Sequence, residues 1–461
     1  MTTSANAVSA FSADLDSFKP NVVRRYAPGD HDVTLKVLYC GYETAARRQH
    51  ALAPVRLVVF TNTAPVSPAR RLRPRLTLAY RPIPSPRSVC HTDVHFVKEL
   101  ATSFPLTPGH EIVGVVTAVG TGVNPKKLRV GDNAAVGCLV DSCFGCRSCR
   151  RAEEQYCLNG NVFTYGGVTK YGRAGPDGAP THGGYSDAMV VNERFCFKLP
   201  PDADLAKCAP LLCAGITTYD PLVRYGCAPD AWRHSSDTGR KRVGVVGIGG
   251  LGQMAVKIAK SFQCEVVAMS TSPEKEQKAR AIGADHFWLT TNEEFMRYRA
   301  ELAKRPSERD APVFKKQDPG PEAPQTPPEG LPTDPAPGDG HHGLDLILDT
   351  VSAPHDLGVF LDVLAPDGQL VILGLNTKPF DVASMSLVFS RKVVRGSLIG
   401  GTRRTEECLA YCVENDVYPE IEVVDAGEIG KVMRKLDEKN DSVVRYVVDC
   451  GTIPKASAAT A

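Results

Sequence analysis

A glycine-rich turn at residues 242–263 limits what this chain can fold into more than any other feature. The stretch RVGVVGIGGLGQMAVKIAKSFQ begins with apolar residues, turns at Gly247, Gly249 and Gly252, and continues with the periodicity of a helix. Apolar residues recur at i, i+3, i+4 and i+7 along that helix, so we expect one buried face. A strand, a G-x-G-x-x-G turn and a helix in this order offer backbone N–H groups and a helix amino terminus to a pyrophosphate.

The residues that follow extend this unit. The stretch CEVVAMSTSPEKEQKARAIGADHFWL, residues 264–289, predicts a second strand, a helix and a third strand. Such a β-α-β-α-β progression is typical of a doubly wound nucleotide-binding fold of the α/β class. We therefore expect the turn to bind a dinucleotide through Gly247, Gly249, Gly250, Leu251 and Gly252.

The end of the second strand predicts which dinucleotide binds. An Asp or Glu at this position ordinarily accepts a hydrogen bond from the ribose 2′-hydroxyl of NAD. Here Ser270, Thr271 and Ser272 occupy it, and Lys275 follows shortly after. Hydroxyl donors and a cation suit a 2′-phosphate, which a carboxylate would repel, so the prediction is NADP(H). The alternative is that Ser272 caps the next helix, and the two roles are compatible.

A second motif, DSCFGCRSCRRAEEQYC, places four cysteines in one short polar segment. Cys143, Cys146, Cys149 and Cys157 follow a C-x2-C-x2-C-x7-C spacing. Four thiolates on one loop can enclose a tetrahedral zinc ion without leaving a position for substrate, so we expect a structural zinc site. The alternatives are an iron–sulfur cluster, which uses similar ligands, and four unliganded thiols.

Composition excludes several classes of partner. A chain of 461 residues with 43% hydrophobic residues can bury the cores of two or more domains, while a formal net charge of +2 gives no electrostatic case for nucleic acid or an anionic membrane. No apolar run approaches the roughly 18 residues of a membrane span, and the amino terminus lacks a signal-peptide pattern. The fifteen cysteines are clustered, which favours metal ligands and thiols over disulfides. We expect a cytoplasmic protein with a small-molecule partner.

Residue types suited to a second zinc site occur at three separated places. VCHTDVH supplies Cys90, PLTPGHEIVG supplies His110 and Glu111, and PLLCAGITTYDPL supplies Cys213. These are the residue types of an open, catalytic zinc site, and their wide separation fits a site assembled in a cleft between domains. From spacing alone this is weak, because a His-Glu pair at a strand start is more often structural.

Together these motifs resemble the zinc-dependent medium-chain alcohol dehydrogenases, most specifically the NADP-dependent cinnamyl alcohol dehydrogenase branch. The matching pieces run in family order over nearly all of residues 20 to 450: VCHTDVHFV, PLTPGHEIVG, the four-cysteine loop, GGYSDAMVV, CAGITTYDPL, GIGGLGQMAVKIAK and VRGSLIGG. The resemblance implies a doubly wound Rossmann domain joined to a mostly β, GroES-like catalytic domain. It also implies two zinc ions per chain, NADP(H) and a homodimer.

The resemblance assigns the catalytic zinc to four residues. Cys90, His110 and Cys213 would be its ligands, and Glu111 would occupy the fourth position in the resting form and yield to water or substrate. The zinc would polarise the aldehyde carbonyl or stabilise the alkoxide, so that hydride passes to or from the nicotinamide without a strong base.

The neighbours of Cys90 receive roles in proton transfer and cofactor binding. Thr92 would take the alcohol proton, His95 would pass it to solvent, Asp93 would lie beside the metal, and His91 would lie near the cofactor phosphates. The alternatives are a surface or packing role for His95 and a cap or turn role for Thr92.

Two further sets of residues are candidates for cofactor and substrate contacts. Residues near the ends of apolar segments are expected at the nicotinamide, although strand-end packing would explain them equally well: Thr217, Val351, Gly374, Ser397 and Ile399. Phe163, in NVFTYGG, stands where this branch more often has a tryptophan. An aromatic pocket there would bind a phenyl or apolar aldehyde such as cinnamaldehyde, and the smaller ring widens the range of aldehydes.

The order of the motifs predicts the domains and two insertions. We expect a catalytic zinc domain at 1–212, a Rossmann domain at 213–391 and a carboxyl-terminal return at 392–461. Residues 42–88 hold nine arginines, seven prolines and one acid, and separate a Cys-Gly pair from VCHTDVH. They are either a retained intron or exon-boundary error, or a real lineage-specific loop. Residues 304–342, rich in proline, predict a disordered surface loop to which His341 and His342 belong.

Two other functions are compatible with these motifs. The first is an inactive zinc- and cofactor-binding product, because residues 42–88 disrupt the approach to Cys90. The second is an NAD-linked polyol dehydrogenase, which the four-cysteine loop and the hydroxyl residues at 270–272 disfavour.

Overall fold

The computed structural model describes residues 3–41, 92–101, 103–173, 175–229, 240–303, 343–376, 378–438 and 444–455. Both predicted insertions, 42–88 and 304–342, lie outside these ranges, as do Cys90 and His91. For Thr92 and His95 the description covers the backbone alone.

Six strands from the second half of the chain form one parallel sheet in the order β12-β11-β10-β13-β14-β15. Their bounds are β10 Arg242–Val246, β11 Glu265–Ser270, β12 His286–Leu289, β13 Leu344–Asp349, β14 Leu364–Ile372 and β15 Val393–Gly396. Counted along the chain, this order is 3-2-1-4-5-6, the arrangement of dinucleotide-binding sheets. The predicted doubly wound fold is confirmed.

Helices cover this sheet, and the glycine turn leads directly into one of them. The helix α6 spans Gly250–Ser261, and its predicted inner face is buried together with Phe262, which follows it: Leu251, Met254, Ala255, Ile258, Ala259 and Phe262. The other helices of this half are η6 Pro273–Lys275, α7 Glu276–Ala281, α8 Glu293–Ala303, α9 Gly358–Asp362 and α10 Ser384–Val388. Burial on both faces explains why the strands read as nearly continuous apolar runs.

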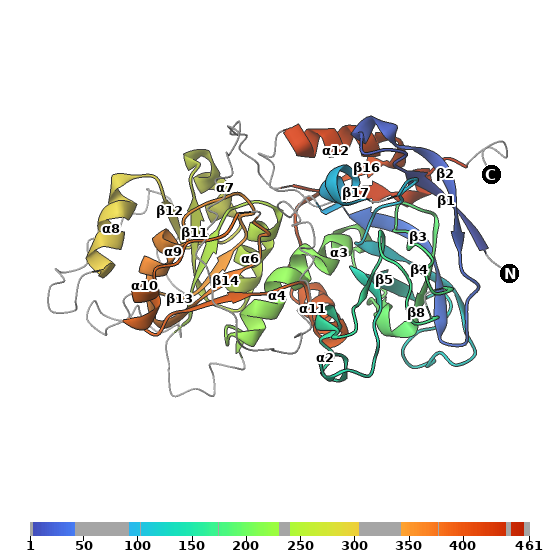
Figure 1. The fold of residues 1–461 in the computed structure, drawn as a ribbon, viewed down its shortest axis with the longest axis horizontal. Coiled ribbons are helices and arrows are strands. Elements are labelled where there is room, and N and C mark those ends of the chain that lie inside the picture. Colours follow the sequence, from blue (N-terminus) through green and yellow to red (C-terminus); the bar gives the residue numbers. More distant parts are fainter. Residues whose placement is uncertain are drawn as a thin grey trace, which may run out of the picture.

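Two helices lie between this sheet and the β-rich half of the molecule (Figure 1). They are α4, Ala214–Arg224, and α11, Thr402–Glu414. The ring of Phe262 is 5.7 Å from the ring of Tyr219 on α4 and 5.0 Å from that of Tyr411 on α11, measured between centroids. This aromatic packing helps to position α4, which begins directly after Cys213.

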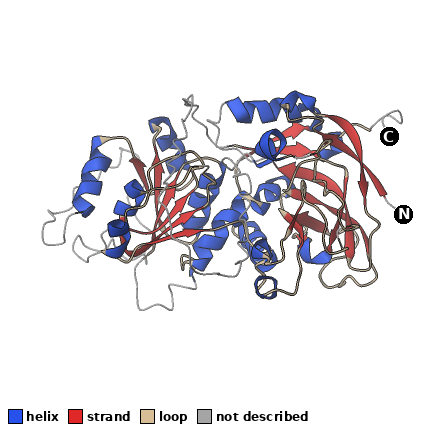
Figure 2. Cartoon of the chain, viewed as in Figure 1, coloured by secondary structure: helices blue, strands red, loops and turns tan. Residues whose placement is uncertain are grey.

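The β-rich half is built on a seven-stranded sheet (Figure 2). Its path is β16-β17-β3-β4-β5-β9, and β8 also pairs with β3. The bounds are β3 Asp32–Gly41, β4 Ile112–Val119, β5 Asn133–Val136, β8 Ala188–Asn192, β9 Phe197–Lys198, β16 Ile421–Asp425 and β17 Arg445–Asp449. The strand β17 pairs antiparallel with β3, so residues near both ends of the chain share one sheet. The boundaries expected at 212 and 391 remain predictions.

Smaller elements complete this half. Two strand pairs stand apart from the large sheet: β1 Thr3–Ser9 with β2 Lys19–Arg25, and β6 Leu139–Asp141 with β7 Val162–Phe163. The helices and helical turns are η1 Leu15–Ser17, α1 Thr92–His95, η2 Phe96–Leu100, α2 Arg147–Arg150, η3 Glu154–Tyr156, η4 Glu193–Phe195, α3 Leu205–Cys208, η5 Ala209–Leu212, η8 Ala426–Glu428, α12 Ile429–Glu438 and η9 Cys450–Thr452. None of the helices within the described ranges has the length and apolar character that crossing a bilayer would require. The cysteines in these ranges form no disulfide.

Candidate metal centres and dinucleotide site

The four cysteines of the second motif come together on the loop between β6 and β7. The Sγ atoms of Cys143, Cys146, Cys149 and Cys157 all lie within 4.8 Å of one another. Two of these distances are 3.5 Å, between Cys146 and Cys149, and 3.9 Å, between Cys143 and Cys149. A tetrahedral zinc ion with Zn–S bonds of about 2.3 Å places its sulfur ligands about 3.8 Å apart. The loop therefore fits one zinc ion, as the spacing predicts.

Backbone N–H groups donate hydrogen bonds to two of these sulfurs, those of Cys143 and Cys146. The N–H of Cys146 donates to Cys143 Sγ at 3.3 Å, and the N–H groups of Cys149 and Leu158 donate to Cys146 Sγ at 3.5 Å and 3.4 Å. The last two bonds lower the pKa of Cys146 to about 6, because a hydrogen-bond donor favours the charged form. The thiolate is the form that binds metal, so these bonds favour the ligand state at Cys146, whereas burial raises the pKa of Cys149 to about 12.

The four-cysteine loop also holds a segment of the other half of the molecule. Glu154, which is fully buried, accepts hydrogen bonds from the backbone N–H of Thr402 at 2.9 Å and from its hydroxyl at 3.1 Å. Tyr156 Oη accepts from the N–H of Leu398 at 3.0 Å. The loop thus fixes the chain between β15 and α11, where Ser397 and Ile399 are predicted to contact the cofactor. Sequence spacing gave no signal for these contacts.

The second metal group is built around His110, at the turn before β4. Gly109 has a φ of +100°, and a Cβ atom there would lie 2.7 Å from Cys40 Sγ, so glycine is required for this turn. His110 Nδ1 is 3.1 Å from Asp93 Oδ1, and Asp93 Oδ2 accepts a hydrogen bond of 2.6 Å from the hydroxyl of Tyr185. All three side chains are buried. A carboxylate can only accept, so Nδ1 carries the proton of this bond.

This arrangement leaves the other nitrogen of His110 available. Its Nε2 has no hydrogen-bond partner of ordinary geometry among the described residues. Burial lowers the pKa of His110, but the charges of Asp93 and Cys213 outweigh burial and hold that pKa well above its usual value. Burial also opposes ionisation of Asp93, and the charge and hydrogen bond of His110 still lower the pKa of Asp93. A histidine oriented by a carboxylate through one nitrogen, with the second nitrogen open, is typical of a metal ligand.

Two thiols lie beside His110. Donor atoms of His110, Cys138 and Cys213 all lie within 4.8 Å of one another, and the structure thereby brings together the two predicted ligands that it describes. Cys138, between β5 and β6, was not predicted. Its only sequence signal is a cysteine five positions before Cys143, which local spacing does not connect to His110.

Glu111 is engaged in an ion pair in this structure, and its predicted role as the resting fourth ligand stays a prediction. It does not belong to the group of described donors around His110. Its Oε1 accepts a hydrogen bond from Nη2 of Arg445 on β17, and both side chains are fully buried. A Cβ atom at Gly41, the last residue of β3, would lie 1.9 Å from Glu111 Oε2, so the buried carboxylate also explains the glycine.

Two aromatic side chains, Phe96 and Tyr165, lie near this group. The ring centroid of Tyr165 is 5.9 Å from that of His110 and 5.1 Å from that of Phe96. Tyr165 is 3% exposed, whereas Phe163 on β7 is 44% exposed. We therefore infer that Phe96 and Tyr165 form an aromatic wall beside His110. The substrate role of Phe163 stays a prediction.

The glycine turn has the geometry that close approach of a pyrophosphate needs. Gly247 has a φ of +84°, and a Cβ atom on it would lie 2.7 Å from Val351 Cγ2. A Cβ atom on Gly252 would lie 1.9 Å from the carbonyl oxygen of Gly247, and one on Gly374 would lie 2.3 Å from that of Val351. These residues follow β10, β13 and β14, so three predicted contacts share the carboxyl edge of the sheet, where such folds bind ligands.

The end of β11 carries hydroxyl residues, and no acidic residue stands at positions 270–272. Ser270 Oγ accepts a hydrogen bond of 3.1 Å from the N–H of Ser272, and the Ser272 side chain makes no cap bond to the helical turn η6. The capping alternative for Ser272 is therefore not seen.

Thr217, a candidate for contact with the nicotinamide, lies one helical turn after Cys213. Its N–H donates to the Cys213 carbonyl at 2.9 Å, so this candidate adjoins a candidate metal ligand.

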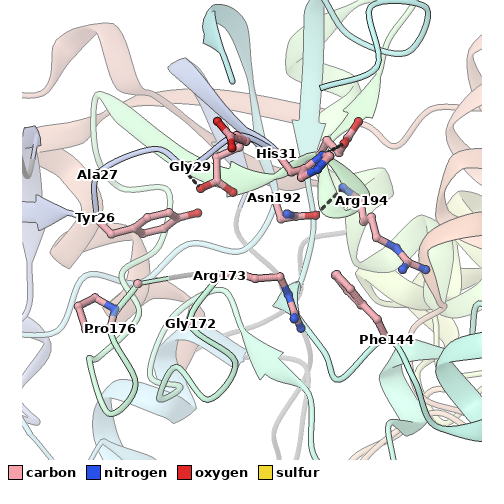
Figure 3. Close-up of a pocket in the computed structure, with 14 residues that line it drawn as sticks. Tyr26, Ala27, Gly29, His31, Phe144, Gly172, Arg173, Pro176, Asn192 and Arg194 are labelled. Carbon is pink, nitrogen blue, oxygen red and sulfur yellow. Dashed lines mark hydrogen bonds and ion pairs between the residues drawn. The ribbon is translucent and has the colours of Figure 1, made fainter. Parts of the chain in front are cut away.

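A cavity of about 940 Å³ is lined by Phe144 of the four-cysteine loop together with Arg173 and Arg194 (Figure 3). The guanidinium carbons of Arg173 and Arg194 are each 4.1 Å from the centroid of the Phe144 ring. Tyr26 and His31 also line this cavity, and none of the predicted site residues does. The predicted chemistry thus does not lie in this cavity.

Comparisons with known proteins agree with the two halves of the fold. Residues 250–414 match the zinc-binding dehydrogenase family, and residues 86–201 match the alcohol dehydrogenase GroES-like domain. The chain is 36% identical over 366 residues to probable cinnamyl alcohol dehydrogenase 6 of Oryza sativa subsp. japonica, covering 79% of this chain and 86% of that protein. It is 37% identical over 368 residues to NADP-dependent alcohol dehydrogenase C 1 of Mycolicibacterium smegmatis, covering 79% and 88%. A solved cinnamyl alcohol dehydrogenase structure from Sorghum bicolor matches with a TM-score of 0.71 at 30% identity, covering 98% of this chain and 100% of that chain.

Proposed function

The chain belongs to the zinc-dependent medium-chain alcohol dehydrogenases, in the cinnamyl alcohol dehydrogenase branch, and from this we propose that it reduces aromatic and other apolar aldehydes with NADPH. In the opposite direction it would oxidise the corresponding alcohols. The observation that carries this proposal is the buried His110, oriented by Asp93 and lying beside Cys213 at the start of α4. The family's third ligand would be Cys90, which lies outside the described residues.

Zinc and NADPH would supply the Lewis acid and the hydride, and residues of the chain would position these groups and transfer the proton. When bound, zinc would act as a Lewis acid on the aldehyde oxygen, and NADPH would supply the hydride. Asp93 and Tyr185 hold the His110 ring in a fixed orientation. We propose that Thr92 donates the proton that completes the alcohol and that His95 restores it from solvent. Phe96 and Tyr165 offer an apolar wall to the substrate.

NADP(H) is proposed as the cofactor because no carboxylate stands at positions 270–272, where one would bind the 2′-hydroxyl of NAD. The name of the Mycolicibacterium smegmatis relative gives NADP as its cofactor. We propose that Ser270, Thr271, Ser272 and Lys275 bind the 2′-phosphate and that the glycine turn binds the pyrophosphate. Family resemblance also supports a homodimer in the cytoplasm, and two zinc ions per chain.

Reversing the charge of Lys275 tests the cofactor proposal. In Lys275→Glu, the KM for NADPH should rise about 10- to 100-fold, because a charge-assisted hydrogen bond of about 1.5–3 kcal/mol would be replaced by repulsion. The KM for NADH should change little. Steady-state rates with both cofactors measure this, and Lys278→Glu, the same change one turn along α7, is the matched control. An unchanged preference for NADPH in Lys275→Glu would refute the assignment.

A further inference from the structure

We propose that His355, held as a cation between the side chain of Asp349 and the carbonyl oxygen of Ala353, is a positioning residue for the dinucleotide. It fixes the loop 350–355 against the glycine turn at Gly247, and so shapes the turn for the pyrophosphate. This inference rests on the proposed binding of NADPH at that turn. It concerns a residue that acts through the loop rather than through its own contact with the cofactor.

The pair of Asp349 and His355 lies beside the glycine turn. Asp349 is the last residue of β13, and in the parallel pairing of β13 with β10 it stands opposite Val246, the residue before Gly247. Its side chain is fully buried. The chain therefore leaves β13 at the carboxyl edge of the sheet, where doubly wound folds bind their ligands.

The contacts of His355 require a proton on both ring nitrogens. Its Nε2 lies 2.9 Å from Asp349 Oδ2, and its Nδ1 lies 2.8 Å from the carbonyl oxygen of Ala353. A carbonyl oxygen can only accept a hydrogen bond, and so can an ionised carboxylate, so a neutral imidazole satisfies just one of the two contacts. The imidazolium form satisfies both, and its charge offsets that of the buried carboxylate.

The surroundings of His355 favour this charge. Burial lowers the pKa of His355, but the hydrogen bond and the charge of Asp349 outweigh burial and hold this pKa above its usual value. Asp356 contributes a second negative charge. The rings of Phe360 on α9 and of Phe380 meet the imidazole edge to face, at centroid distances of 5.7 Å and 5.4 Å, and carry no charge.

The loop that His355 closes packs directly on the glycine turn. The hydroxyl of Thr350 donates to the carbonyl oxygen of Gly247 at 3.1 Å, and a Cβ atom on Gly247 would lie 2.7 Å from Val351 Cγ2. The N–H of Val351 donates to Asp349 Oδ1 at 3.0 Å, and the other oxygen of this carboxylate binds His355. One carboxylate therefore joins the start of the loop to its end.

Loss of the His355 proton is expected to weaken dinucleotide binding, because the neutral ring keeps only one of its two contacts. Since the pKa of His355 is raised, the cation should persist above the ordinary histidine pKa of about 6.5 and disappear as pH rises through the higher value. The affinity for NADPH should be full below the raised pKa and should fall above it, because apparent affinity follows the fraction of protein that is competent to bind.

Equilibrium binding of NADPH and of NADH to the full-length protein, measured as a function of pH, tests this inference. His355→Gln should raise the Kd of both cofactors by about tenfold or more at neutral pH, and by the same factor, because the loop contacts the turn that both would share. Lys275→Glu, in contrast, should affect NADPH alone. His355→Gln should also remove the rise of the Kd with pH.

Two further variants complete the test. Asp349→Asn should move the rise of the Kd to lower pH, because the charge that raises the pKa of His355 is gone. His286→Gln is the matched control: His286 also pairs with a carboxylate, Glu265, at 3.1 Å, but it lies at the amino end of β12. It should leave the Kd and its pH dependence unchanged.

The outcomes separate this inference from the proposed function. If the wild type binds NADPH and His355→Gln binds it equally well, or with the same pH dependence, the inference is wrong and the proposed cofactor stands. A loss confined to NADPH in His355→Gln would also overturn it. If the wild type binds neither cofactor, the proposed function fails and the inference fails with it. Thermal unfolding checks each variant; should His355→Gln not fold, an unmoved pH profile in Asp349→Asn overturns the inference.

Discussion

Replacing His110 with alanine is expected to reduce turnover of cinnamaldehyde by about a thousandfold or more while leaving NADPH binding unchanged. Lewis-acid stabilisation of the reacting oxygen contributes several kcal/mol, and each 1.4 kcal/mol corresponds to about a tenfold change in rate. His110 contributes the open nitrogen of the candidate metal group, whereas the glycine turn proposed to bind NADPH lies on the carboxyl edge of the other sheet. Steady-state kinetics and equilibrium binding of NADPH separate the two effects.

A second histidine provides the control for this variant. His286 also pairs with a carboxylate, Glu265, at 3.1 Å, but it belongs to neither metal group and lies at the amino end of β12. His286→Ala should retain nearly full turnover. Near-normal kcat in His110→Ala would exclude the metal mechanism, whatever ligand set completes the site.

Replacing Arg445 with methionine is expected to destabilise the fold by about 3–5 kcal/mol. The variant leaves the carboxylate of Glu111 buried without its cation, and removal of one partner of a buried ion pair has costs of this size. Both side chains are fully buried, and they join the start of β4 to the start of β17. Denaturant unfolding measures the change, provided that the transition has a single step.

Two further variants establish the origin of that loss. Glu111→Leu combined with Arg445→Met should recover most of the stability, because an apolar pair of similar volume removes the uncompensated charge. Arg391→Met breaks an ion pair of the same type, with Asp367, in which both side chains are largely exposed, and should change stability little. Equal effects in Arg391→Met and Arg445→Met would show that burial of the pair does not matter.

Local patterns predicted the parts of this protein that are formed by neighbouring residues. The glycine turn, the buried face of α6 and the four-cysteine loop each occupy fewer than about 30 consecutive residues, so spacing alone constrains their geometry. The order of the strands then follows from the rules of the doubly wound fold. The three-dimensional arrangement agrees with all of these features.

Contacts between distant segments escaped prediction because no periodicity connects them. Glu111 and Arg445 are 334 positions apart, and Glu154 and Thr402 are 248 apart. Cys138 stands close to the four-cysteine motif in the sequence, yet the turn between β5 and β6 directs it to the other metal group. Likewise, the burial of Tyr165 beside His110 depends on β7 and on the helical turn η2, which contributes Phe96. Only the fold brings such residues together.

The rate of NADPH oxidation with cinnamaldehyde, measured for the full-length protein and for a shortened chain that lacks residues 42–88, tests the central proposal most directly. We predict turnover with NADPH that exceeds turnover with NADH. If both proteins turn over, residues 42–88 are a tolerated loop; if only the shortened chain does, they disable the enzyme that the rest of the sequence encodes. Absence of turnover in both, in protein that is folded and carries two zinc ions per chain, would contradict the proposed function.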